Sequence, residues 1–279
     1  MTILNPDPTL AFIGGGNMAR SIIGGLVSSG WPVDQIQVSD PSGSQRDFLQ
    51  SQFNLSCFED NGQCVETADI VMLAVKPQVL RQALDSIRDP LVVRQPLLIS
   101  IAAGIRSTTL AHWVGEEIPI VRVMPNTPAL VNCGISGMMA NPLASDQQKR
   151  DAEQIMRAVG EVVWVDSDED IDTVTGISGS GPAYFFKLME IMIQTGIHHG
   201  LDGPTARKLS LQTALGAARL ALGSEHGPDE LRRQVTSPGG TTEAAIRAME
   251  NRDIDATFSS GITAAIVKSD DLAKTLGEI

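Results

Sequence analysis

A glycine-rich turn between an apolar strand and a helix limits the possible folds of this chain more than any other feature of its sequence. Residues 10–14 (LAFIG) have the continuous apolar character of a buried strand, and residues 17–30 carry apolar side chains at helical spacing. The turn between them fits the pattern G-x-G-x-x-A with Gly14, Gly16 and Ala19. The first glycine permits the tight turn, the second lets a phosphate approach the backbone, and the alanine keeps the helix close to the sheet. The stretch predicts a pyrophosphate site at a helix N-terminus, with a simple packing turn as the alternative.

Strand-like and helix-like segments alternate after this turn. The strand segments are apolar, which is typical of a parallel sheet with helices on both faces. We therefore expect an α/β fold with a Rossmann-type doubly wound sheet over residues 1–166, followed by an all-helical C-terminal domain over residues 167–279. The expected strands are residues 10–14, 36–40, 69–75, 97–101, 119–124, 135–140 and 161–165, and the expected long helices of the second domain are residues 183–200, 204–223 and 253–276.

Composition excludes several classes of partner. The net charge of -12 and the aromatic content of 4% argue against nucleic acid and anionic membranes as partners. No run of about 18 apolar residues indicates a membrane span, and the first residues lack the basic segment and apolar core of a signal peptide. Cys57, Cys64 and Cys133 form no CxxC pair. We therefore expect no metal site, and we expect free thiols in a cytoplasmic protein.

The end of the second expected strand supports two interpretations of the cofactor. Asp40 lies where an acid would bind the ribose diol of NAD. The alternative is that neighbouring polar side chains hold the 2′-phosphate of NADP, namely Ser39, Ser42, Ser44 and Arg46. This stretch leaves both interpretations open.

A second glycine turn, SPGGTTEAAI (residues 237–246), precedes a helix-like pattern late in the chain. One interpretation is an ordinary helix start, in which Glu243 is favourable near the positive end of the helix dipole. The other is a nest of backbone N–H groups that accepts a carboxylate. In that case Gly240 and Thr241 are the expected donors, and Ser237 supports the turn.

Seven stretches, in order along nearly the whole chain, resemble pyrroline-5-carboxylate reductase. They are FIGGGNMA, AVKPQ, SIAAGI, RVMPNTPA, SGSGPAYFF, QTALGAA and VTSPGGTT, of which the last three are specific to that family. The resemblance implies hydride transfer from NAD(P)H to the cyclic imine Δ1-pyrroline-5-carboxylate, giving L-proline in the last step of proline biosynthesis. NADP(H) is the family's usual cofactor and NAD(H) the second. The resemblance also implies a homodimer formed through the helical domain, and dimers of this family often assemble into decamers.

The resemblance assigns cofactor residues and substrate residues. The cofactor residues are Gly14, Gly16, Asn17, Met18 and Ala19 at the pyrophosphate, Ser39 and Asn61 at the adenosine ribose or its phosphate, Ala74, Val75, Lys76 and Pro77 in a loop after a strand, and Ala102 and Ala103 beside the nicotinamide. To the substrate residues already expected at the second glycine turn the resemblance adds Thr242, with Asp168 and Glu225 near the bound product or the pocket rim. Thr242 is the expected catalytic residue, because its hydroxyl meets the ring nitrogen. A protonated imine requires orientation rather than a strong base.

Two other functions fit parts of the sequence. A dehydrogenase of the β-hydroxyacid type places a catalytic lysine on a long central helix, and Lys187 has such a position. However, the SGSGPAYFF stretch before it does not fit that group. A non-catalytic nucleotide-sensing protein would keep the first glycine turn but has no reason to keep SPGGTT.

Overall fold

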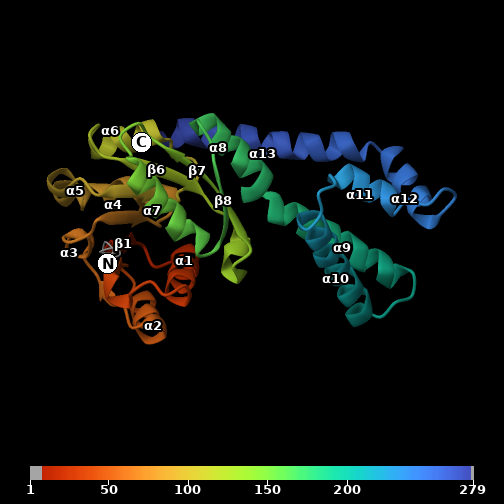
Figure 1. Ribbon diagram of the computed structural model, residues 1–279, viewed down its shortest axis with the longest axis horizontal. Coiled ribbons are helices and arrows are strands. Elements are labelled where there is room, and N and C mark those ends of the chain that lie inside the picture. Colours follow the sequence, from red (N-terminus) through yellow and green to blue (C-terminus); the bar gives the residue numbers. More distant parts are fainter. Residues whose placement is uncertain (1–7, 278–279) are drawn as a thin grey trace, which may run out of the picture. The chain divides into compact units, whose positions relative to one another are not determined.

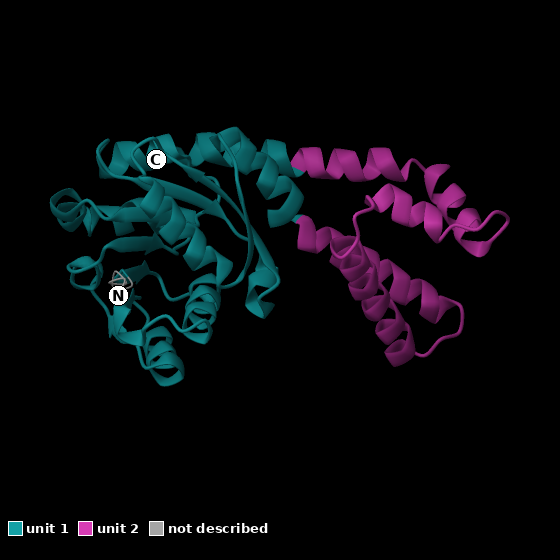
Figure 2. Cartoon of the chain, in the orientation of Figure 1, with its two compact units in different colours: residues 1–180, 265–279 teal, residues 181–264 magenta. Residues whose placement is uncertain are grey.

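The computed structural model describes residues 8–277 of the chain. Its contacts divide the chain into two compact units, one formed by Met1–Ser180 with Ala265–Ile279 and the other by Gly181–Ala264 (Figure 2). The expected absence of a signal peptide rests on residues that lie mostly outside this described part. The domain boundary expected between residues 166 and 167 stays a prediction.

The first unit is built around an eight-stranded sheet with the strand order β3-β2-β1-β4-β5-β6-β7-β8 (Figure 1). The strands are β1 (Leu10–Ile13), β2 (Ile36–Ser39), β3 (Ser56–Phe58), β4 (Ile70–Leu73), β5 (Leu97–Ser100), β6 (Ile120–Met124), β7 (Gly134–Ala140) and β8 (Gly160–Trp164). The strands from β3 to β6 are all parallel. Because β1 lies between β2 and β4, the strand order reverses beside β1, and ligands of such sheets bind at this switch point. The expected Rossmann-type sheet is confirmed.

Helices cover both faces of this sheet because alternate residues of a strand point to opposite faces. Leu10 and Phe12 of β1 belong to one buried cluster, and Ala11 and Ile13 to the other. The first cluster includes residues of α1 (Asn17–Ser28), α2 (Gly43–Phe53) and α7 (Asp146–Arg157). The second includes residues of α3 (Asn61–Val65), α4 (Pro77–Asp85), α5 (Arg88–Arg94), α6 (Ser107–Val114) and the end of α13 (Ile254–Gly277).

The last two strands depart from the expected parallel sheet. β7 pairs with β6 in the antiparallel direction, and β8 then runs parallel to β7. The connection between β6 and β7 spans only residues 125–133 and contains the short 3-10 helix η2 (Thr127–Val131). A parallel crossover needs a dozen or more residues, so this short connection returns the chain antiparallel. The sheet is therefore mostly parallel, and the expectation of a parallel sheet does not extend to the pairing of β6 with β7.

The second unit is helical in its described residues. It contains α9 (Gly181–His198), α10 (Gly203–Leu222), α11 (Pro228–Gln234), α12 (Thr241–Glu250) and the first part of α13. The three long helices expected here are confirmed. The remaining short elements, in the first unit, are η1 (Val33–Gln35), α8 (Asp168–Val174) and the π-turn η3 (Thr175–Gly179). No helix within residues 8–277 has the length and apolar character needed to cross a membrane.

Many large apolar side chains of the second unit are exposed. Phe185 and Phe186 of α9 are about two-thirds exposed (62% and 63%), and Leu222 at the end of α10 is 88% exposed. A soluble single chain rarely leaves this much apolar surface uncovered, and such patches usually mark interfaces. The surface of this unit therefore has the character of an oligomer interface.

Candidate functional site

The first glycine turn leaves open space at the start of α1. Gly14 has φ +101°, and a Cβ at this position would lie 2.8 Å from the carbonyl oxygen of Ala74. Only glycine fits this close approach between the turns that follow β1 and β4. Gly16 is the N-cap of α1, and a Cβ built there meets no atom within 4 Å. Since no described side chain caps α1, its first N–H groups, which include those of Asn17 and Met18, are available to a phosphate.

Asp40 anchors this turn. Its Oδ2 accepts a hydrogen bond from the Gly15 N–H at 2.8 Å, and its Oδ1 accepts one from the Ser42 N–H, also at 2.8 Å. The Arg46 guanidinium donates to the Asp40 carbonyl oxygen at 2.6 Å. The carboxylate at Asp40 is therefore used to hold the backbone that would receive the pyrophosphate. It does not line the neighbouring cavity, and the role of an acid at the ribose, one of the two interpretations of this stretch, stays a prediction.

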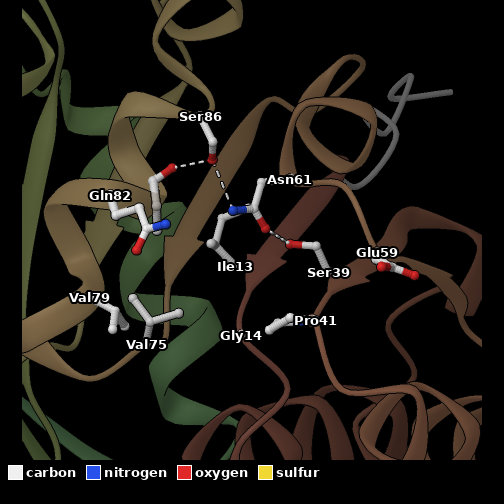
Figure 3. Close-up of a pocket in the computed structure, with 11 residues that line it drawn as sticks. Ile13, Gly14, Ser39, Pro41, Glu59, Asn61, Val75, Val79, Gln82 and Ser86 are labelled. Carbon is white, nitrogen blue, oxygen red and sulfur yellow. Dashed lines mark hydrogen bonds between the residues drawn. The ribbon is translucent and has the colours of Figure 1, made fainter.

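A cavity of about 320 Å³ lies at the carboxyl ends of β1, β2 and β4 (Figure 3). This volume is within the range of small-molecule sites. Its lining is Ile13, Gly14, Ser39, Pro41, Glu59, Asn61, Val75, Val79, Gln82, Ala83 and Ser86. Four predicted cofactor residues, Gly14, Ser39, Asn61 and Val75, are thus brought together around one cavity at the switch point of the sheet.

A row of hydrogen-bonded side chains crosses the wall of this cavity (Figure 3). The Ser39 hydroxyl donates to Asn61 Oδ1 at 2.7 Å, and Asn61 Nδ2 donates to the Ser86 hydroxyl at 2.9 Å. Ser86 in turn donates to the Ala83 carbonyl oxygen at 2.6 Å. These bonds fix the direction of the amide. Because Ser39 is fully buried and Asn61 is partly exposed, Asn61 is the more accessible of the two to a ligand.

The other predicted cofactor residues lie at the same edge of the sheet. Ala74 and Val75 follow β4, Lys76 is the exposed N-cap of α4, and Pro77 is its first residue. Ala102 and Ala103 follow β5, where Ala102 is buried and Ala103 exposed. Glu59 and Ser86 also line the cavity, and no motif in the sequence points to either of them. Both belong to this cavity through elements with no local motif, namely the end of the short strand β3 and the residue after α4.

The second glycine turn lies in the other unit. Gly240 is the N-cap of α12, and its N–H donates to the Ser237 carbonyl oxygen at 3.0 Å. The Gly239 N–H donates to Glu243 Oε2 at 2.8 Å. No described side chain caps α12, so the N–H groups of Thr241 and Thr242 are the donors that remain for an incoming anion. The Gly240 N–H itself closes the turn.

Asp168 is built into the interior of the first unit. Its Oδ1 accepts from Arg122 Nη1 at 2.6 Å, and its Oδ2 accepts from the Ser107 hydroxyl at 2.8 Å. Arg122 on β6 is 1% exposed and Asp168 is 7% exposed. Glu225, in contrast, lies exposed between α10 and α11. Asp168 thus has protein partners in the interior of the first unit, whereas Glu225 is an exposed residue of the second unit. Their expected place near the bound product or the pocket rim stays a prediction.

A second ion-pair group continues from this interior. Arg106 lies 2.7 Å from Asp270 and also pairs with Glu169, while Ser269 donates to Asp172 at 2.7 Å. The hydrogen bond that Arg106 donates to Glu169 comes first among the causes that raise the pKa of Arg106. Since Ser269 and Asp270 belong to α13, these bonds fasten the end of that helix to the unit of the sheet.

Comparisons with known proteins agree with this architecture. The family model for pyrroline-5-carboxylate reductase dimerisation matches residues 168–272, and the model for NADP oxidoreductase, coenzyme F420-dependent, matches residues 9–104. The pyrroline-5-carboxylate reductase of Pseudomonas aeruginosa is 47% identical over 271 residues, which cover 97% of this chain and 99% of that protein. The Escherichia coli K12 enzyme of the same name is 36% identical over 270 residues, covering 96% and 100%.

Solved structures of the same family match over most of this chain. The pyrroline-5-carboxylate reductase from Coxiella burnetii has a TM-score of 0.92 at 41% identity and covers 96% of this chain and 99% of its own. The pyrroline carboxylate reductase of Plasmodium falciparum, solved with NADP bound, has a TM-score of 0.85 at 29% identity, covering 96% and 99%. The resemblance found in the sequence is thus confirmed, and this chain belongs to the pyrroline-5-carboxylate reductase family.

Proposed function

We propose that this chain reduces Δ1-pyrroline-5-carboxylate to L-proline with NADPH, as the last step of proline biosynthesis. The observation that carries the proposal is the 47% identity to a pyrroline-5-carboxylate reductase across both units. The β-hydroxyacid dehydrogenase and nucleotide-sensing alternatives explain only parts of the sequence. We place the reaction in the cytoplasm, consistent with free thiols at Cys57, Cys64 and Cys133.

The residues at the sheet edge fit a dinucleotide. No described side chain caps the N-terminus of α1, and there is open space beside Gly16, so this helix end can bind a pyrophosphate. Asn61 would contact the adenosine ribose, with Ser39 fixing its amide. The loop from Ala74 to Pro77 would border the cofactor, and Ala102 and Ala103 would lie beside the nicotinamide. The cofactor supplies the hydride, and the protein supplies orientation.

The second glycine turn is the proposed substrate site. The N–H groups of Thr241 and Thr242 would bind the substrate carboxylate, while Ser237 and Gly240 keep the turn closed. The Thr242 hydroxyl would accept a hydrogen bond from the iminium N–H and donate one to the neutral amine that forms. Glu225 is proposed at the rim of this pocket. We assign Asp168 a supporting role through Arg122 rather than a contact with product.

The exposed apolar face of the second unit supports a homodimer formed through these helices. The matching dimerisation model covers the same helices. We propose that two chains complete each other's active sites in that dimer and that dimers assemble further into decamers. An isolated monomer would then be inactive.

The direct test is the oxidation of NADPH by the purified protein in the presence of Δ1-pyrroline-5-carboxylate, with L-proline identified as product. A β-hydroxyacid with NADP+ in the reverse direction is the matched comparison. We expect turnover with the imine and none with the hydroxyacid. Absence of turnover with the imine, in a protein that is folded and dimeric, would overturn the proposal.

A further inference from the structure

The cavity in the first unit contains one charged side chain, and it is an acid. Among the described residues that line the cavity, Glu59 alone is ionisable. It directly follows β3, and Phe58 of β3 pairs with Ser39 of β2. Glu59 is therefore level with Asp40, the first residue after β2. Figure 3 shows its carboxylate at the same end of the cavity as Ser39 and Asn61.

The nearest cation at this end is already paired. Arg46 of α2 contacts Glu59 Oε2 at 3.0 Å through Nη2, while its Nη1 donates to the Asp40 carbonyl oxygen at 2.6 Å. The Arg46 side chain is largely buried, with 22% exposure, whereas that of Glu59 is 77% exposed. The guanidinium is thus held in place, and the acid is the partner that is free to turn.

These contacts affect the two nicotinamide dinucleotides in opposite directions. A phosphate monoester carries a charge of about -1.5 to -2 near pH 7, so a 2′-phosphate is repelled by Glu59 and must take Arg46 from it. The two hydroxyls of an unphosphorylated ribose donate hydrogen bonds that a carboxylate accepts. Asp40 does not line this cavity, and its carboxylate is oriented by the N–H groups of Gly15 and Ser42, so Glu59 is the acid that faces the ribose.

We propose that Glu59 is a specificity-determining residue of this chain, which opposes the 2′-phosphate of NADPH and favours the ribose diol of NADH. The negative charge of Glu59 repels the 2′-phosphate directly. Its ion pair with Arg46 also withholds from the phosphate the cation that would bind it. The unmodified protein therefore uses NADH alongside NADPH, and its selectivity is set outside the glycine turn. This inference rests on the proposed function only in assigning the cavity to the adenosine end of the cofactor.

Nucleotide binding tests the inference without turnover. The dissociation constants of 2′,5′-ADP and 5′-AMP are measured by calorimetry for the unmodified protein, Glu59→Gln and the control Glu66→Gln. The control removes an exposed acid just after α3 and changes the net charge equally. Loss of one charge close to a phosphate should raise the affinity ratio of 2′,5′-ADP to 5′-AMP about tenfold in Glu59→Gln. In Glu66→Gln the ratio should stay within about twofold of the unmodified value.

A second variant and a kinetic readout complete the test. Arg46→Gln should lower the same ratio about tenfold, because the phosphate loses its cation. The ratio of kcat/KM for NADPH to that for NADH should move in the same direction as the binding ratio in each variant. If Glu59→Gln binds both nucleotides with the affinity ratio of the unmodified protein, including the case of equal gains for both, the inference about Glu59 is overturned and the proposed cofactor site is not. Failure of the unmodified protein to bind either nucleotide overturns the proposed cofactor site as well.

Discussion

Arg122 and Asp168 form an ion pair of 2.6 Å in the interior of the first unit, between β6 and the first residue of α8. Both side chains are almost inaccessible to solvent. Removing Asp168 leaves the buried Arg122 with the more distant Asp172, 3.7 Å away, as its carboxylate partner, and such a loss of compensation for a buried charge costs roughly 3 kcal/mol. We therefore expect Asp168→Ala to lower the free energy of unfolding by about that amount, as measured by urea denaturation.

The control for Asp168→Ala is Glu169→Ala, the adjacent residue of α8. Glu169 pairs with Arg106 but has a side chain that is 69% exposed, and exposed pairs contribute little to stability. We expect a much smaller loss than for Asp168. Equal losses of unfolding free energy in the two variants would contradict this prediction, because the buried Arg122–Asp168 pair would then contribute no more to stability than the exposed pair of Glu169.

The ion pairs that Arg106 forms with Glu169 and Asp270 predict a loss of stability in acid. The hydrogen bond from Lys274 is the largest cause that lowers the pKa of Asp270, and Arg106 adds to it. The hydrogen bond from Arg106 is the largest cause that lowers the pKa of Glu169. A carboxyl whose pKa is lowered on folding stabilises the fold above its unfolded pKa, and the contribution disappears as the pH falls through the folded pKa.

We therefore expect the difference in unfolding free energy between the unmodified protein and Arg106→Gln to be present at pH 6. It should shrink as the pH falls below the usual values of 3.8 for Asp and 4.5 for Glu. Urea denaturation across this range measures the difference. A difference that is constant down to the acid transition would contradict the assignment to these carboxyls.

Much of the fold could be predicted because its main elements carry local patterns. β1 is apolar at every position, and α9 and α10 have long runs at helical spacing. β3 could not be predicted, since it has three residues and an exposed serine and lies at the sheet edge. The reversal at β7 depends on the length of a connection, and no residue pattern marks it.

The candidate site was likewise predictable only where its residues belong to a local sequence motif. The motif residues Gly14 and Gly16 could be assigned because their chemistry is a property of the turn itself. Glu59 could not, because its place in the cavity depends on the pairing of β3 with β2. Likewise, no motif indicates that Asp40 anchors the glycine turn through the Gly15 N–H; this role appears only when the loops after β1 and β2 are brought together.

The three cysteines should differ in reactivity. Burial raises the pKa of Cys64 to about 12, so its thiol stays protonated near neutral pH, while Cys133 is exposed. The reactive species is the thiolate. In the native protein a thiol reagent should modify Cys133 first and leave Cys64 until the protein unfolds. Peptide mass spectrometry of the labelled protein checks the order, with Cys133→Ser as control, and early labelling of Cys64 would contradict it.

Glu243 is expected to weaken substrate binding. Its carboxylate accepts the Gly239 N–H at the second turn, where an anionic substrate is proposed to bind. Glu243→Gln keeps an acceptor oxygen but removes the charge, so the KM for the imine should fall about threefold to tenfold. The KM for NADPH should stay unchanged. Glu250→Gln, at the other end of α12, is the control, and an unchanged KM for the imine in Glu243→Gln would place the substrate carboxylate elsewhere.

Thr242 is the residue on which the proposed chemistry depends. It lies in the first turn of α12, partly exposed, and no described side chain caps that helix. If its hydroxyl meets the ring nitrogen, Thr242→Ala loses one charge-assisted hydrogen bond, and kcat/KM for the imine should fall by tens-fold. Thr242→Ser keeps the hydroxyl and should retain most of the activity.

Two further measurements separate a chemical role for Thr242 from a structural one. The affinity for NADPH and the dimer content should be the same in Thr242→Ala as in the unmodified protein, because the hydroxyl is assigned to the substrate alone. Kinetics of Thr242→Ala that match the unmodified enzyme would remove Thr242 from the mechanism. Equal activity losses in the alanine and serine variants would instead point to the threonine methyl group, and the contact with the ring nitrogen would be wrong.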